Sequence, residues 1–270
     1  MVSRCRRYTR EVERIRALDD AGEEQDYLEV LKEKEHTPIV WGEPMPGVKI
    51  IDLQEQRYKE AFQFICDVVV PEDVVLKSTR LLDDPESLEA FEEKVIFIMR
   101  DRTSMIAVNE ENEIVGILVM KVVRKFDFSK TFSQLQVRRG KIFLTIMKFY
   151  NNVYKETDVF EKLQVDMYLR LYWIGVRHSY RRNKIGHQMM WCSLDLLKSL
   201  NLNGIMALLT TAKLQATAHY MGMDSIYTYF YSRWRDLSET LIFRGIGGGN
   251  YCCALMAGYI NYEKVIIEKE

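Results

Sequence analysis

The sequence predicts an α/β fold, with a mixed, mostly antiparallel central sheet flanked by helices on both faces. Two apolar, β-branched runs at 104–108 and 114–123 surround a polar turn, which is typical of an antiparallel hairpin. An apolar run at 169–176, an amphipathic stretch at 185–200 and a second apolar run at 204–210 follow in the order strand, helix, strand. The chain has 270 residues, of which 47% are hydrophobic, so it can bury one substantial core.

Before the hairpin, the pattern predicts one strand and two helices. Residues 48–53 form the strand, and residues 57–70 carry apolar side chains at helical spacing up to a break at Pro71-Glu72-Asp73. The second helix begins at Asp84-Pro85 and runs to residue 99. The Pro- and Gly-rich segment 36–47 predicts a loop.

After the hairpin, residues 138–163 predict one long helix, and residues 212–221 predict a short helix that ends at Gly222. Two further strands are expected at 225–234 and 250–262, with a glycine-rich loop at 245–249. Residues 1–40 are dense in charge and predict a helical surface extension, whereas residues 41–270 predict a single domain.

Composition argues against several classes of protein. The formal net charge is -1, which gives no global basic field for nucleic acid. No apolar run approaches the roughly 18 residues that a membrane span needs, and the N-terminus lacks an apolar secretory core. Five cysteines without a framework spacing favour reduced thiols in a cytoplasmic protein, and no His/Cys cluster indicates a metal. The sequence indicates no oligomeric state.

The segment 173–186 predicts an anion site. An apolar strand is followed by a basic turn and then by the start of a helix. The first amides of a helix have no internal partner, and the helix dipole adds positive potential, so phosphate binds there readily. Arg181, Arg182 and Lys184 add formal charge to the same place. The alternative is an ordinary turn between a strand and a helix on a solvated surface.

The same segment resembles the acetyl-coenzyme A loop of the GNAT N-acetyltransferase superfamily. The family pattern, Val-x-Pro-x-Tyr-Arg-Gly-x-Gly-Ile-Gly, is matched at Val176, at Tyr180-Arg181 and at Ile185-Gly186. His178 stands where Pro is usual, Arg182 where the first Gly is common and Lys184 where the middle Gly is usual. The order of predicted elements over about residues 48–262 is similar to that of the insect arylalkylamine N-acetyltransferases in particular.

The resemblance implies acetyl-coenzyme A as co-substrate and a set of residues that bind it. These residues are Ile174, Val176, Arg181, Arg182, Asn183, Lys184, Ile185 and Gly186. In GNAT domains, backbone amides of the central strand stabilise the thioester oxyanion, and the matching stretch here is Ile174-Gly175-Val176. Gly175 equally fits a strand glycine that packs under a helix.

The resemblance also implies a carboxylate base after the first helix. At the place of the family's Asp-Glu-Pro-Leu segment this chain has Glu72-Asp73-Val74-Val75, so Asp73 and Glu72 are the candidate catalytic residues. A solvated carboxylate at a helix end is the alternative. No side chain is assigned as the acid for the thiolate, because Leu214 replaces the Ser that related enzymes carry beside the residue matched by Gln215.

The predicted function is transfer of acetyl from acetyl-coenzyme A to a small amine, an arylalkylamine first, by direct attack in a ternary complex. No metal, nucleic acid or membrane partner is expected. The alternative is a GNAT-like protein that has lost catalysis and keeps the fold and the coenzyme. Lys184, Leu214 and the missing Pro before Val75 favour this alternative.

Overall fold

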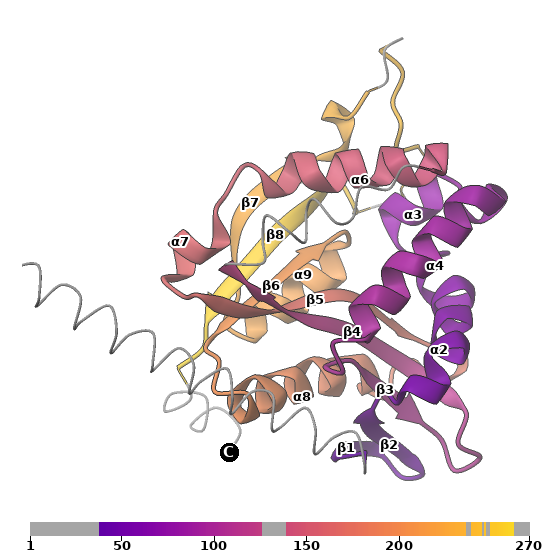
Figure 1. Cartoon of the computed structure of the whole chain (residues 1–270), viewed down its shortest axis with the longest axis vertical. Helices are drawn as coiled ribbons and strands as arrows, with labels where there is room; N and C mark the ends of the chain where they lie inside the picture. Colours follow the sequence, from indigo (N-terminus) through magenta and orange to yellow (C-terminus); the bar gives the residue numbers. More distant parts are fainter. Residues whose placement is uncertain (1–37, 126–138, 236–238, 245, 247–248, 262–270) are drawn as a thin grey trace, which may run out of the picture.

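The computed structural model describes residues 38–125, 139–235, 239–244, 246 and 249–261. Their strands form one mixed sheet in the order β1-β2-β3-β4-β5-β6-β8-β7, in which only the β5–β6 pair is parallel (Figure 1). The strands are β1 (Val40–Met45), β2 (Val48–Asp52), β3 (Met105–Val108), β4 (Ile114–Arg124), β5 (Met167–Val176), β6 (Gly204–Leu209), β7 (Asp224–Phe230) and β8 (Cys252–Tyr259). The mixed, mostly antiparallel sheet predicted from the sequence is confirmed.

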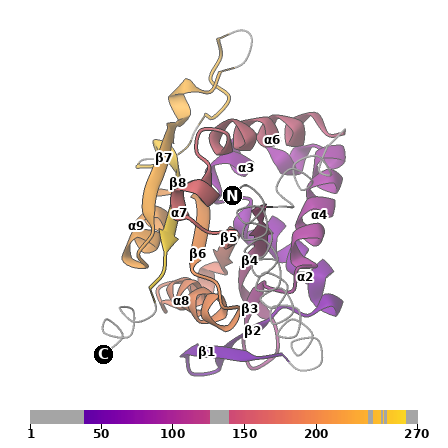
Figure 2. The same cartoon turned by 60° about the vertical axis from the view of Figure 1, so that its left-hand side comes forward.

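Helices cover both faces of the sheet, as predicted (Figure 2). The helices are α2 (Tyr58–Phe64), α3 (Val74–Ser78), α4 (Pro85–Met99), α6 (Lys141–Tyr154), α7 (Val159–Leu163), α8 (Ile185–Ser199) and α9 (Ala212–Tyr220). The turn-like elements are η1 (Glu55–Arg57), η2 (Ile65–Val69), η3 (Leu81–Asp83), η4 (His178–Tyr180) and η5 (Tyr231–Arg233). One core lies between the sheet and α2, α4, α6 and α7; a second lies between the sheet and α8 and α9.

Three elements differ from the prediction. The segment predicted as a loop at 36–47 contains β1, which pairs antiparallel with β2 and tolerates Pro44 because it is an edge strand. The long helix expected at 138–163 is two helices, and the Asp158 carboxylate caps the second by accepting hydrogen bonds from the amides of Phe160 and Glu161.

The third difference lies after α2, where the helix continues as a π-helical turn, η2, and is followed by α3. Asp73, predicted at the end of the helix, is instead the N-cap of α3. The other expected elements are confirmed within a few residues, including the C-terminal Gly222 of α9, which has φ +83°. The helices expected within residues 1–40, and most of the loop at 245–249, lie outside the described residues.

The strands β5 and β6 separate at their C-terminal ends. They pair from Tyr168 opposite Gly204 to Leu171 opposite Ala207, and no pairing continues beyond these residues. The rest of β5 pairs only with β4 on its other side. One edge of β5 from Tyr172 to Val176 is therefore open, and this opening leads to the loop before α8.

A β-bulge lies in β5 at the start of this opening. Val119 of β4 is opposite Trp173 and Met120 is opposite Leu171, so Tyr172 is the extra residue. Because strand side chains alternate, the extra residue turns Tyr172 and Trp173 to the same face of the sheet. Both contact the core under α4 and α6. The bulge thus directs two successive aromatic side chains towards one cavity.

Candidate active site

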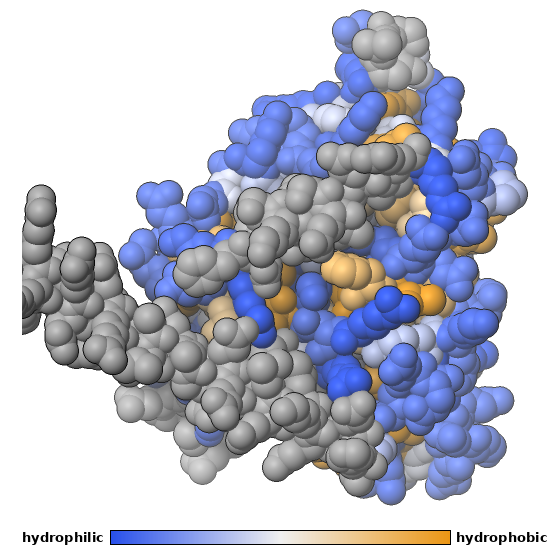
Figure 3. All heavy atoms as spheres, in the orientation of Figure 1, coloured by the Kyte–Doolittle hydropathy of each residue, from blue (hydrophilic) through white to orange (hydrophobic). Residues whose placement is uncertain are grey.

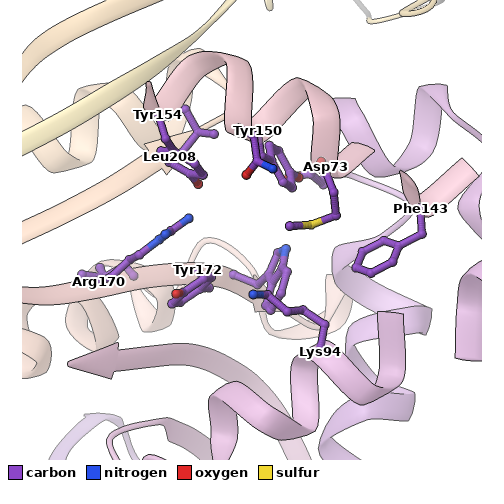
Figure 4. A pocket seen from close by; sticks show the side chains of 12 residues that line it. Asp73, Lys94, Phe143, Tyr150, Tyr154, Arg170, Tyr172 and Leu208 are labelled. Carbon is purple, nitrogen blue, oxygen red and sulfur yellow. The ribbon is translucent and has the colours of Figure 1, made fainter. Parts of the chain in front are cut away.

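Two cavities meet at the open end of the sheet. The larger one, the β5–β6 cleft, has a volume of ≈ 410 Å³ and is lined by the ends of β5 and β6 and by the loop before α8. The smaller one, the tyrosine cavity, has a volume of ≈ 70 Å³ and lies among α4, α6 and β5 (Figure 4). Both are lined by Asp73, Leu171, Tyr172, Trp173 and Leu208. The two cavities are therefore adjacent at Asp73.

The loop before α8, predicted as an anion site, has two residues with left-handed backbone. Arg182 has φ +70° and Lys184 has φ +57°, and these are the two positions at which the family pattern has glycine and this chain does not. Lys184 is the N-cap of α8, so its left-handed conformation turns the chain into the helix. Both residues and Asn183 are exposed, whereas Ile185 is buried beneath the loop. The chain keeps the glycine geometry with two cationic side chains, each at a cost of about 1 kcal/mol.

Arg181 lies in the same loop but holds it in place. Its Nε donates a hydrogen bond of 3.0 Å to the Val176 carbonyl, and its Nη1 forms an ion pair of 2.6 Å with Glu72. These contacts join the end of β5, the loop and the turn before α3. Glu72 is exposed and lines only the β5–β6 cleft, so of the two candidate carboxylates it is Asp73 that reaches both cavities.

Asp73 is held by three hydrogen bonds. Its Oδ1 accepts from the amides of Val75 and Leu76, each at 2.9 Å, and its Oδ2 accepts from the Thr210 hydroxyl at 2.9 Å. Burial raises the pKa of this carboxyl above its usual value, and the three donors oppose the shift. A carboxylate with a raised pKa, fixed in place at the junction of two cavities, is suited to accept a proton.

Ile174, Gly175 and Val176, the stretch expected to supply oxyanion donors, all line the β5–β6 cleft. An added Cβ at Gly175 would lie 2.6 Å from Val69 Cγ2 of η2. Gly175 therefore lets a helix pack closely on β5, as the second interpretation of this residue held. A Cβ at Gly186 would make only an ordinary contact of 3.4 Å with Val176, so packing does not require that glycine.

Comparison with solved structures identifies the architecture. Arylalkylamine N-acetyltransferase 2 from Aedes aegypti is 15% identical, with a TM-score of 0.73, over 79% of this chain and 99% of that chain. A putative arylalkylamine N-acetyltransferase 7 from the yellow fever mosquito Aedes aegypti is 20% identical, with a TM-score of 0.72, over 84% of this chain and 98% of that chain. A Drosophila melanogaster polyamine N-acetyltransferase is 17% identical, with a TM-score of 0.68, over 79% of this chain and 100% of that chain.

The chain has the GNAT N-acetyltransferase fold. No family model matches the sequence, and no curated protein matches it by sequence.

The structure gives the positions of several side chains whose roles the sequence did not predict. Gln215 Nε2 donates to the carbonyls of Leu209 and Cys252, at 3.0 and 3.1 Å, and so joins the ends of β6 and β8. Thr211 and Thr217 line the β5–β6 cleft, as does Leu214. Tyr220 is exposed, and it does not line either cavity.

Sequence reasoning missed the polar residues of the tyrosine cavity. They are Lys94 of α4, Tyr150, Asn151 and Tyr154 of α6, and Arg170 and Tyr172 of β5. Burial raises the pKa of Tyr150 and Tyr154, so both hydroxyls stay protonated. A signal was present, because Lys94 and Arg170 are charged residues at core-facing positions of an amphipathic helix and of an apolar strand.

Among the described residues, no group of three His, Cys, Asp or Glu side chains could hold a metal ion. Nor does any helix in these residues combine the length and apolarity needed to cross a bilayer. On the face shown in Figure 3, apolar side chains come to the surface between α6 and α4, with hydrophilic side chains around them. This is the region of the tyrosine cavity.

Proposed function

We propose that the protein is an N-acetyltransferase that transfers acetyl from acetyl-coenzyme A to a small amine. The observation that carries this proposal is the position of Asp73, which lines both the β5–β6 cleft and the tyrosine cavity. The first cavity offers an anion site and an open strand edge. The second is enclosed by aromatic side chains and is small, which suits the reacting end of an amine.

The loop from Arg181 to Gly186 would bind the coenzyme diphosphate. Exposed Arg182 and Lys184 supply positive charge beside the first turn of α8. Gly186 leaves space for the close approach of the diphosphate, since packing within the chain does not use it. The pantetheine arm would follow the open edge of β5 past Val176 and Ile174 towards Asp73.

The chemistry follows from this arrangement. The neutral amine attacks the thioester carbonyl carbon, and backbone amides on the open edge of β5 stabilise the developing oxyanion. Asp73 accepts the proton that the amine loses. The C–S bond then breaks, and the coenzyme thiolate takes a proton from solvent at the open cleft. Direct transfer in a ternary complex requires no covalent enzyme intermediate, because the two substrates meet at one point.

Two sources of support bear on the acceptor. The solved structures with the same fold include enzymes whose names specify arylalkylamines and polyamines. The second cavity has aromatic walls. Arylalkylamines are therefore the first acceptors to test, followed by agmatine and polyamines.

Two measurements test the proposal. Calorimetry with acetyl-coenzyme A should give a dissociation constant well below 1 mM, and a thiol-release assay with tryptamine, dopamine, agmatine and polyamines should show turnover. Absence of coenzyme binding at millimolar concentration would end the proposal. Binding without turnover of any amine would favour the second candidate, a GNAT-like protein that binds the coenzyme and has lost catalysis, as Lys184 and Leu214 suggest.

A further inference from the structure

The charge inside the tyrosine cavity is unusual for an amine pocket. Arg170 extends from β5 with its guanidinium carbon 4.1 Å from the Tyr154 ring centroid and 4.3 Å from that of Tyr172 (Figure 4). Both rings thus pack against the guanidinium, which also makes a side-chain hydrogen bond with Tyr154. A guanidinium has five N–H donors in its plane, so further donors remain for a ligand. Nε is buried and has no hydrogen-bond partner among the described residues.

A second basic side chain lies in the same cavity. Lys94 of α4 is 9% exposed, and its side chain lines the cavity on the side opposite α6 (Figure 4). Burial, together with the charges of Arg170 and Lys121, lowers the pKa of Lys94 to about 7. Lys121 is itself neutralised by Asp101 at 3.1 Å. Within the described part of the chain, no carboxylate forms an ion pair with Lys94 or with Arg170.

Arg170 is always charged, and Lys94, with a pKa of about 7, is charged in part at neutral pH. Buried positive charge without a counter-ion is costly, since a buried charge is normally paired. A purely cationic acceptor would raise the free energy further by adding another positive charge. A carboxylate would lower the free energy, because it can accept two parallel hydrogen bonds from the edge of a guanidinium. We propose that the acceptor carries a carboxylate as well as its amine, and that Arg170, with Lys94, binds this carboxylate. The presence of an amine on this acceptor rests on the proposed function, whereas the carboxylate site at Arg170 does not.

The positions of the charged groups narrow the class further. Arg170 lies at one end of the cavity and Asp73 towards the other, with Tyr150 and Tyr154 along one wall (Figure 4). An amine at Asp73 and a carboxylate at Arg170 must therefore be separated along the ligand. The cavity is small, with room for a few groups of water size at about 10–15 Å³ each. A short ω-amino acid fits this pattern better than an α-amino acid, whose two charges are adjacent.

Binding of a matched pair of ligands tests the proposal. We would titrate 4-aminobutyrate and butylamine, which differ by the carboxylate, into the full-length protein saturated with coenzyme A. The affinity for 4-aminobutyrate should exceed that for butylamine about 10- to 100-fold, as charge-assisted hydrogen bonds typically allow. Arg170→Met, which keeps the apolar stem between the two rings, should reduce this ratio to near one. Lys148→Met removes an exposed charge from α6, the helix that carries Tyr150 and Tyr154, and should leave the ratio unchanged.

Proton uptake on ligand binding distinguishes an Arg170 that binds a carboxylate from one that has only a structural role. A bound carboxylate raises the pKa of Lys94, so binding at pH 7.5 should take up a proton. Calorimetry in buffers of different ionisation enthalpy measures this uptake, which Lys94→Met should abolish. Equal or weaker binding of 4-aminobutyrate in the wild-type protein would overturn the proposal, and so would an equal loss for both ligands in Arg170→Met. Carboxylate-dependent binding without acetyl transfer would instead refute only the proposed function.

Discussion

The hydroxyl of Thr210 donates a hydrogen bond of 2.9 Å to Oδ2 of Asp73. This contact joins the residue after β6 to the first residue of the α3 turn, 137 positions earlier in the chain. The other carboxylate oxygen of Asp73 caps α3. Thr210 is in turn held by Tyr231, whose hydroxyl donates to the Thr210 carbonyl at 2.8 Å. One side chain therefore combines a structural role, as a helix cap, with the proposed role of proton acceptor.

Asp73→Asn should separate these two roles. Asparagine caps a helix about as well as aspartate, and its amide can also face the Thr210 hydroxyl, so the melting temperature should change little. It cannot accept a proton, so kcat for acetyl transfer should fall by about 100- to 10,000-fold. Thiol release and thermal unfolding of the same preparation measure both effects.

The pH profile gives a second measure of the same prediction. Burial raises the pKa of Asp73, so the acidic limb of kcat/KM should lie above the ordinary aspartate value of about 3.9. Asp73→Asn should abolish this limb. Asp73→Ala is the control for the cap, since it should cost about 1 kcal/mol of unfolding free energy as well as the activity. Full turnover in Asp73→Asn would contradict the assignment.

Lys184→Gly should change stability and coenzyme affinity in opposite directions. Glycine relieves the left-handed strain at φ +57° but loses more entropy on folding, so stability should rise by about 0 to 1 kcal/mol. The loss of charge should weaken acetyl-coenzyme A binding about two- to tenfold, and less at high salt. Calorimetry and chemical unfolding measure the two effects.

Asn201→Gly is the matched control, because Asn201 has φ +54° and follows the other end of α8. It should leave coenzyme affinity unaltered. If Lys184→Gly bound the coenzyme as tightly as wild type, Lys184 would have no part in phosphate binding.

The pair formed by Glu72 and Arg181 should be structural. Arg181→Met removes the ion pair and the hydrogen bond to the Val176 carbonyl, so it should cost about 1–2 kcal/mol of stability and also weaken coenzyme binding. Glu72→Gln keeps the shape of the pair and should leave kcat within about twofold of wild type. A fall of 100-fold or more in Glu72→Gln would make Glu72, rather than Asp73, the base.

The sequence predicts the sheet and the loop well because both depend on local pattern. The apolar run before α8, the basic turn and the helix start at Ile185 are adjacent in the chain. Even the two positions where this chain replaces a glycine of the family pattern are recognisable, and the structure shows a positive φ at both, Arg182 and Lys184. Local spacing thus suffices to place this part of the site.

The tyrosine cavity could not be assembled from the sequence, because its residues come from α4, α6, β5, β6 and the N-cap of α3. The bulge at Tyr172 changes which side chains of β5 share a face, and a pattern of alternation cannot reveal one extra residue. Likewise, α3 has only five residues, too few to show a period, so the sequence predicts Asp73 at the end of the preceding helix rather than as the cap of α3. Buried charges at Lys94 and Arg170 were the available clue.

Lys94→Met should stabilise the protein most strongly at neutral and acidic pH. The folded-state pKa of Lys94 is about 7, below its ordinary value of 10.5, so between these two values the unfolded chain binds more protons than the folded protein. Wild-type stability therefore gains from this group as pH rises through the window, and the full cost of the buried charge applies below pH 7. Removing the amine should raise the unfolding free energy by up to about 4 kcal/mol at pH 6.

The advantage of the Lys94→Met variant should then decline towards zero as pH approaches 10.5, the value at which the unfolded lysine also loses its proton. Urea unfolding of both proteins from pH 6 to 10 measures the difference, and other titrating groups cancel in the comparison. Parallel curves for the two proteins would show that the folded state does not depress the pKa of Lys94. A stabilised variant with weakened 4-aminobutyrate binding would show that the lysine is kept at the expense of stability, because it serves the ligand.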